Sequence, residues 1–184
     1  MRIAAIFLVL LAACVGGNPP RESFFTLNAP EPPTAAAEAP SIAVGPVTIP
    51  EMVDRPQIVV RLGPNQVQVL EQARWAEPLK IAIGRVVAAN LAASLGARRA
   101  PSRGADADYR IALDVQRFES PADAALVEVL WTITSKAGRQ SGRSVARQPI
   151  AAKDYASLAA AHSAALAAIS TEIAAAIRKP VPGT

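Results

Sequence analysis

Residues able to do acid–base, thiol or metal chemistry are scarce in this sequence of 184 residues, which has one cysteine and one histidine. His162 falls on the apolar stripe of an alanine-rich run, with no obvious carboxylate or cysteine partner. We interpret it as a core or boundary residue rather than a general base. Ser157 and Ser163 lie near it and are interpreted as ordinary helix residues. No Gly-rich phosphate loop, nucleophile elbow or Walker pattern is present. We therefore expect no enzyme activity, no metal ion and no cofactor.

The cysteine is the one side chain whose surroundings specify a reaction. Residues 1–14 read MRIAAIFLVLLAAC, with one basic residue, an apolar run and small residues before Cys14. This layout is typical of a secretory signal, and its ending resembles a bacterial lipobox. There the thiol receives a diacylglycerol, and cleavage leaves Cys14 as the acylated N-terminus. The alternative is a plain secretory signal with a cysteine nearby by chance. The apolar run is too short for a spanning helix, which needs about 20 residues.

The predicted cleavage divides the chain into three parts. Residues 1–13 are the signal peptide, residues 14–22 are the lipidated cysteine with a short tether rich in Gly and Pro, and residues 23–180 are a single domain. Acylation leaves no free thiol, which excludes disulfides, a cysteine metal site and a thiol nucleophile. Without Arg2, 18 basic residues stand against 15 acidic ones, a net charge of +3. Basic residues are scattered and aromatic residues few, so nucleic acid is not an expected partner. A weak preference for an anionic membrane surface stays open.

The middle of the sequence has the patterns of β-strands. The run Ser41–Pro50 alternates apolar and polar residues, and Pro46 indicates an edge or a bulge. The segments 57–62 and 66–70 flank a Gly-containing turn, which predicts a hairpin. Further strands are predicted over residues 109–115, 125–134 and 140–148, with a bulge or strand end near Arg117.

Two helices are predicted from apolar residues that recur every three to four positions. The first ends at Leu95, with Pro78 in its first turn and Gly96 just after its end. The second begins after Asp154 as N-cap and reaches about Arg178. The expected fold class is therefore α+β: a mixed, largely antiparallel sheet with two long helices packed on one face.

Two short stretches are not explained by bulk composition: residues 49–59 (IPEMVDRPQIV) and residues 73–79 (ARWAEPL). In a structural interpretation, Asp54 caps a turn and pairs with Arg55, Pro56 fixes the strand entry, and Trp75 packs the helix start onto the hairpin. In a functional interpretation, the same turns form a docking surface with Arg74 and Trp75 as its anchors. Both interpretations stay open from the sequence.

Taken together, these motifs resemble a known family. The segments P-x-x-x-D-R-P-Q-I-V (residues 50–59), R-W-A-E-P-L (74–79) and D-x-x-R-F-E (114–119) are similar to PqiC-type (YmbA) lipoproteins. The late Asp-Tyr pair at 154–155 and the Phe-Phe-Thr-Leu at 24–27 also fit. This family supplies the auxiliary lipoproteins of ABC-type lipid transport systems.

The resemblance implies an outer-membrane lipoprotein that faces the periplasm. Its partners would be an MCE-domain protein bridging the envelope and, through it, an inner-membrane permease and ATPase. A homo-oligomeric ring is a further implication. By the usual sorting pattern of lipoproteins, Val15 after the cysteine favours the outer membrane. The rival hypothesis is a scaffold lipoprotein that regulates an envelope enzyme or an outer-membrane protein. A third hypothesis, a periplasmic hydrolase, would need a catalytic pair around His162.

Overall fold

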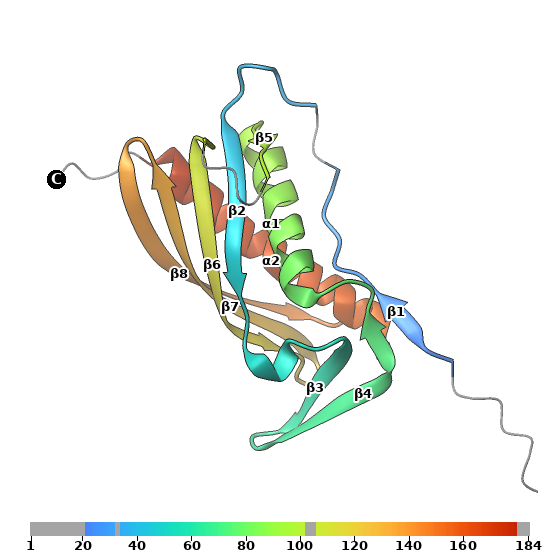
Figure 1. Ribbon diagram of the computed structural model, residues 1–184. Helices are drawn as coiled ribbons and strands as arrows, with labels where there is room; N and C mark the ends of the chain where they lie inside the picture. Colours follow the sequence, from blue (N-terminus) through green and yellow to red (C-terminus); the bar gives the residue numbers. More distant parts are fainter. Residues whose placement is uncertain (1–20, 32–33, 102–105, 180–184) are drawn as a thin grey trace, which may run out of the picture.

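The computed structural model of the protein describes residues 21–31, 34–101 and 106–179 and contains two β-sheets and two α-helices (Figure 1). The predicted signal peptide and Cys14 lie outside the described residues. The strands are β1 (Ser23–Phe25), β2 (Ser41–Thr48), β3 (Gln57–Gly63), β4 (Gln66–Trp75), β5 (Arg98–Arg99), β6 (Tyr109–Glu119), β7 (Ala124–Ser135) and β8 (Gly138–Pro149). The helices are α1 (Leu79–Leu95), α2 (Tyr155–Arg178) and a 3-10 turn, η1 (Glu51–Val53).

The strands divide between a three-stranded sheet, β1-β4-β3, and a five-stranded sheet, β5-β2-β6-β7-β8. The β3–β4, β6–β7 and β7–β8 pairs are antiparallel, while β1–β4, β2–β5 and β2–β6 are parallel. The α+β class is confirmed, and so is the predicted hairpin. The expectation of one largely antiparallel sheet is wrong. Hairpin patterns in the sequence reveal antiparallel neighbours, but β2 joins β6 only after the hairpin and α1 have been inserted between them, as parallel pairing requires.

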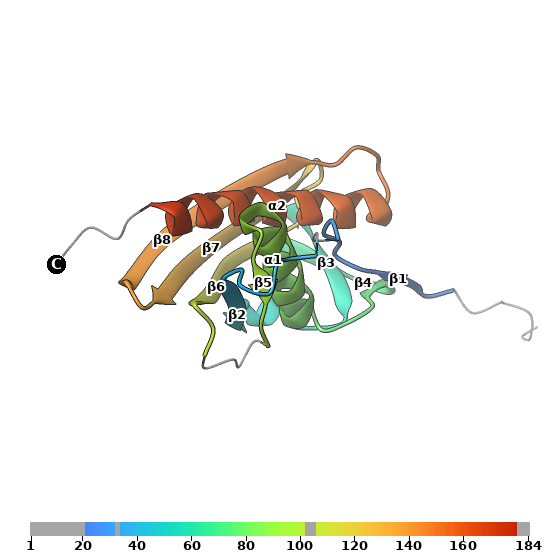
Figure 2. The same cartoon turned by 90° about the horizontal axis from the view of Figure 1, so that it is seen from above.

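The two helices differ in length and in position. Helix α1 has 17 residues and α2 has 24, so the expectation of two long helices on one face is wrong in part. Helix α2 crosses the five-stranded sheet over β7 and β8, whereas α1 lies beside β2 and packs against α2 (Figure 2). Helix α1 starts late because β4 continues to Trp75, five residues beyond the predicted strand end. Pro78 is therefore its N-cap residue, and Gly96 ends it in the left-handed conformation at φ 61°.

The core lies between the inner face of the five-stranded sheet and the two helices. Leu166, Ile169 and Ile173 of α2 are fully buried there, as are Ile111 and Ile133 from the sheet. By length and composition α2 could cross a membrane. Its packing against β7, β8 and α1 is that of a core helix instead.

Two local predictions agree with the structure. The Asp154 side chain accepts a hydrogen bond from the Ser157 backbone N–H at 2.6 Å, as an N-cap does. The β6–β7 register shifts between Val115 and Arg117, which is the predicted bulge. A second shift falls between Val44 and Val47 of β2, around Pro46.

Trp131 of β7 lies across Gly142 of β8, where a Cβ atom would collide with the indole ring. The indole N–H donates to Ser144 Oγ at 3.0 Å, so the ring cannot easily turn away. We expect Gly142→Ala to lower the free energy of unfolding by about 1–3 kcal/mol, as overpacking does. Urea denaturation measures this loss. Gly63→Ala is the matched control, because its added Cβ has open space. Equal stability of the two variants would contradict the prediction.

Candidate functional site

The two stretches singled out in the sequence meet where β3 begins and β4 ends. The first residue of β3 pairs with Arg74 of β4. The backbone N–H of Trp75 donates to the carbonyl of Pro56 at 2.7 Å. The hairpin therefore brings Asp54, Arg55 and Pro56 to the same corner as Arg74 and Trp75.

The charges at this corner are not paired as the sequence suggested. Asp54 forms an ion pair with Lys80 Nζ of α1 at 2.8 Å, not with its neighbour Arg55. The reason is that α1 begins beside the turn and brings Lys80 within reach. Arg74 pairs with Glu22 Oε1 at 2.9 Å. Arg55 is exposed and has no ion-pair partner within the described ranges.

Trp75 is a core residue. Its side chain is only 6% exposed. Its ring meets Phe118 edge to face, with centroids 6.1 Å apart, and His162 in the same way at 6.4 Å. The structural interpretation fits the indole, whose burial leaves it no surface to offer as a docking anchor. The exposed members of the motif are Asp54, Arg55 and Pro56.

His162 is sealed in the same aromatic cluster. Its side chain is fully buried, its ring stacks on Phe118 at 4.0 Å, and its Nε2 lies 2.9 Å from Ser120 Oγ. Burial lowers the pKa of His162 to about 3, because the charged imidazolium would lose its hydration. The side chain is therefore neutral near pH 7. A hydrolase that relies on this histidine does not fit a ring without access to solvent.

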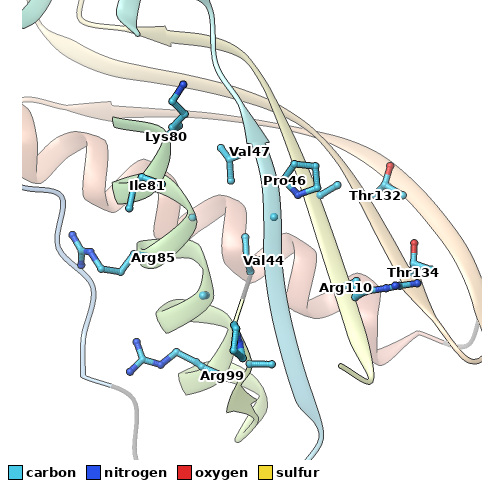
Figure 3. Close-up of a pocket in the computed structure, with 16 residues that line it drawn as sticks. Val44, Pro46, Val47, Lys80, Ile81, Arg85, Arg99, Arg110, Thr132 and Thr134 are labelled. Carbon is cyan, nitrogen blue, oxygen red and sulfur yellow. The ribbon is translucent and has the colours of Figure 1, made fainter. Parts of the chain in front are cut away.

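A groove of about 1130 Å³ opens between α1 and the outer face of the five-stranded sheet (Figure 3). Helix α1 forms one wall, the bulged part of β2 lies in the middle, and β6 and β7 form the other side. Gly84 allows α1 to lie close to β2, because a Cβ atom at this position would lie only 3.3 Å from Val47 Cγ2. Pro46, Val47 and Ile81 give the groove its apolar surface, and Ile81 is 58% exposed.

Basic side chains surround this α1–β2 groove. Lys80 and Arg85 come from α1, Arg99 from β5 and Arg110 from β6. Lys80 is paired with Asp54, and Arg85 is paired with Glu77. Arg99 and Arg110 are exposed and have no ion-pair partner in the part of the chain that the structure describes. Thr132 and Thr134 of β7 add hydroxyl groups. This mixture of cations, hydroxyls and apolar surface suits an anionic, partly apolar ligand or protein segment.

The groove was not predicted from the sequence. Arg110 alternates with buried residues along β6, which indicates only a solvent-facing side. Its neighbours across the groove come from α1 and β5, and the parallel pairing that brings them together leaves no local pattern. The groove is joined to the predicted motif through the Asp54–Lys80 pair. Among the described residues, no group of three or more His, Cys, Asp or Glu side chains is placed to hold a metal ion.

Comparisons with known proteins agree with this architecture. The model of the family described as "ABC-type transport auxiliary lipoprotein component" matches residues 25–174. This match confirms the resemblance inferred from the motifs. No curated protein matches the chain in sequence.

Solved structures with a similar fold include a crystal structure of an uncharacterized protein. It is 18% identical, with a TM-score of 0.74, over 85% of this chain and 99% of that chain. A Xanthomonas campestris protein of the DUF330 family is 25% identical, with a TM-score of 0.65, over 83% of this chain and 92% of its own. The PelC dodecamer of Paraburkholderia phytofirmans is 13% identical over 74% of this chain and 91% of that chain. Its TM-score of 0.35 is too low to bear on assembly.

Proposed function

Because this chain belongs to the family of ABC-type transport auxiliary lipoprotein components, we propose that it is the outer-membrane lipoprotein of an intermembrane lipid transport system. It docks a periplasm-spanning MCE-domain protein, which connects it to an inner-membrane permease and ATPase. The cargo is phospholipid or a related apolar molecule. The family match over residues 25–174 is the observation that carries this proposal. The family is one of transport components and not of known enzymes.

The anchor is the acylated Cys14. In this proposal residues 1–13 are removed, residues 14–22 connect the lipid to the domain, and the domain faces the periplasm. One acyl chain binds a membrane reversibly, whereas several together hold stably. The diacylglycerol and a further acyl chain expected of such lipoproteins would therefore keep the domain at the membrane. Val15 is the residue that favours sorting to the outer membrane.

The docking surface is the α1–β2 groove together with Arg55 at its Asp54–Lys80 end. Two unpaired arginines in the groove, Arg99 and Arg110, favour an acidic segment of the MCE-domain protein, and exposed Ile81 favours an apolar contact beside it. Several copies of this domain in a ring would place such grooves around the end of a conduit. The ring is part of the proposal, and the mass of the purified complex gives the number of copies in it.

Partner capture tests this function. The lipidated protein is purified from gently solubilised envelopes, and its partners are identified by mass spectrometry. We expect an MCE-domain protein, recovered about thirtyfold less with Arg55→Glu or Arg110→Glu, because reversing a charge at a docking hot spot costs roughly 2 kcal/mol.

Lys179→Glu is the control for capture. It makes the same reversal of charge at the exposed C-terminal end of α2, which packs on the other face of the sheet from the groove, and should recover the partner normally. Recovery of only cell-wall synthases or outer-membrane assembly proteins would contradict transport and favour a scaffold.

A further inference from the structure

We propose that Phe24 and Tyr155 form a second, non-covalent membrane contact that orients the domain on the lipid surface beside its anchor. This inference rests on the proposed acylation of Cys14. The partner is the interface of the bilayer that holds the acyl chains. Both aromatic side chains are exposed, Phe24 by 61% and Tyr155 by 43%.

The two aromatic residues belong to one end of the molecule. β1 lies at the N-terminal end of α2 in both views (Figures 1 and 2). Phe25 joins them, because its ring meets Tyr155 edge to face with centroids 6.1 Å apart. Phe24 also lines a shallow groove of about 540 Å³ with Ala156 and Ala160 of α2. The aromatic end therefore continues onto the exposed side of the helix.

The exposed side of α2 carries no charge for most of its length. From Tyr155 to Thr171 the helix sequence has no Asp, Glu, Lys or Arg, and the first is Glu172. A helix face in water is normally lined by charged residues. Alanines alone bind a membrane weakly, so the aromatic rings supply the affinity. The alanine face adds no charged group that would have to be dehydrated near lipid.

The length of chain before β1 limits where this end can be. Cys14 and Phe24 are ten residues apart, which at full extension is at most about 36 Å. A domain of this size has a radius of gyration of roughly 15 Å, so the connection is no longer than about one domain diameter. Among the described residues, which begin at Arg21, Phe24 is the first exposed large apolar side chain. Because this connection is short, the local concentration of the Phe24 side chain at the bilayer is high in every orientation of the domain.

Charges at the rim also favour lipid. Arg21, three residues before Phe24, and Lys153, two residues before Tyr155, are exposed and have no ion-pair partner within the described segments. The nearby acidic groups are occupied, because Glu22 pairs with Arg74 and Asp154 caps α2. Basic residues beside aromatic ones are the usual composition of a contact with an anionic lipid surface.

A tryptophan placed at Phe24 reports this contact. Lipidated Phe24→Trp protein is reconstituted into phosphatidylethanolamine and phosphatidylglycerol vesicles whose acyl chains are brominated, and quenching of its emission is measured. The native Trp75 and Trp131 are buried and give a constant background. Leu62→Trp is the control, because Leu62 is 56% exposed on the β3–β4 hairpin, away from β1.

We expect the new tryptophan at position 24 to shift to shorter wavelength and to be quenched, while that at position 62 is not. Protein that floats with the vesicles but shows no quenching at position 24 would overturn the contact and leave the anchor standing. Failure to float would refute the anchor itself. A blue shift without vesicles, growing with protein concentration, would overturn the proposal by showing that a second copy covers this end.

Discussion

Trp75→Ala is expected to lower the free energy of unfolding by about 3–5 kcal/mol, as removal of a buried aromatic ring does. The indole is 6% exposed and packs on Phe118 and His162, which belong to β6 and α2. It therefore joins the three-stranded sheet to the rest of the core. Since a domain is stable by only about 5–15 kcal/mol, this loss is a large part of the total. Urea denaturation should show a midpoint about 2 M lower.

Two variants separate packing from docking at this site. Trp75→Phe keeps an aromatic ring against Phe118 and should lose less than half as much stability. Arg74→Ala removes the partly exposed pair with Glu22 and should cost about 0–1 kcal/mol. A Trp75→Ala protein as stable as the native one would contradict the packing described above. If Trp75→Ala is destabilised and also fails to recover a partner protein, the loss of binding reflects unfolding and not the loss of a docking contact.

Acidification is expected to destabilise the protein through His162. The unfolded chain binds a proton at this histidine below its ordinary pKa of 6.5, whereas the folded protein, with a pKa of about 3, does not. The stabilisation is therefore complete above pH 6.5 and is lost as the pH falls from 6.5 toward 3. The loss is about 2 kcal/mol at pH 5 and about 3 kcal/mol at pH 4.

His162→Gln isolates this effect. The amide can still bond to Ser120, but it has no charge to gain, so the variant should show a much flatter stability between pH 6.5 and pH 4.5. Carboxyl groups do not confuse the comparison. The pKa values of Asp108, Glu119, Glu128 and Asp154 are lowered, so their contributions are lost as the pH falls below about 4.5, and they are lost alike in native protein and variant. Parallel curves for native protein and variant in urea titrations would contradict the prediction.

Local sequence signals predicted the local structure. The hairpin, the Asp154 cap, the Gly96 helix end and the bulge near Arg117 depend on a few neighbouring residues, and each was visible in the sequence. The extension of β4 to Trp75 was missed because polar residues interrupt the apolar pattern after Leu70, and because residues 73–75 pair with β1, a strand about 50 residues earlier in the sequence.

Longer-range features could not be read in the same way. The parallel entry of β2 between β5 and β6 depends on how the whole chain folds back, and the α1–β2 groove exists only as its result. Trp75 and Arg55 belong to similar motifs, yet Trp75 is buried and Arg55 is exposed. The sequence alone could not show which of the two side chains packs in the core and which is open to a partner. Asp54 forms its ion pair with Lys80 rather than with the adjacent Arg55. This too could not be predicted from the sequence, because it depends on where α1 packs in the fold.

The role as a lipid-anchored transport component is tested most directly by following pulse-labelled phospholipid in separated inner and outer membranes. Cells carrying the native gene, a deletion or Cys14→Ser are compared, with the amount of protein matched by immunoblot. We expect the deletion and Cys14→Ser to alter the distribution of label alike, and the native gene to restore it, because a domain without its anchor cannot hold the conduit at the membrane. The same distribution in all three strains would contradict the transport role.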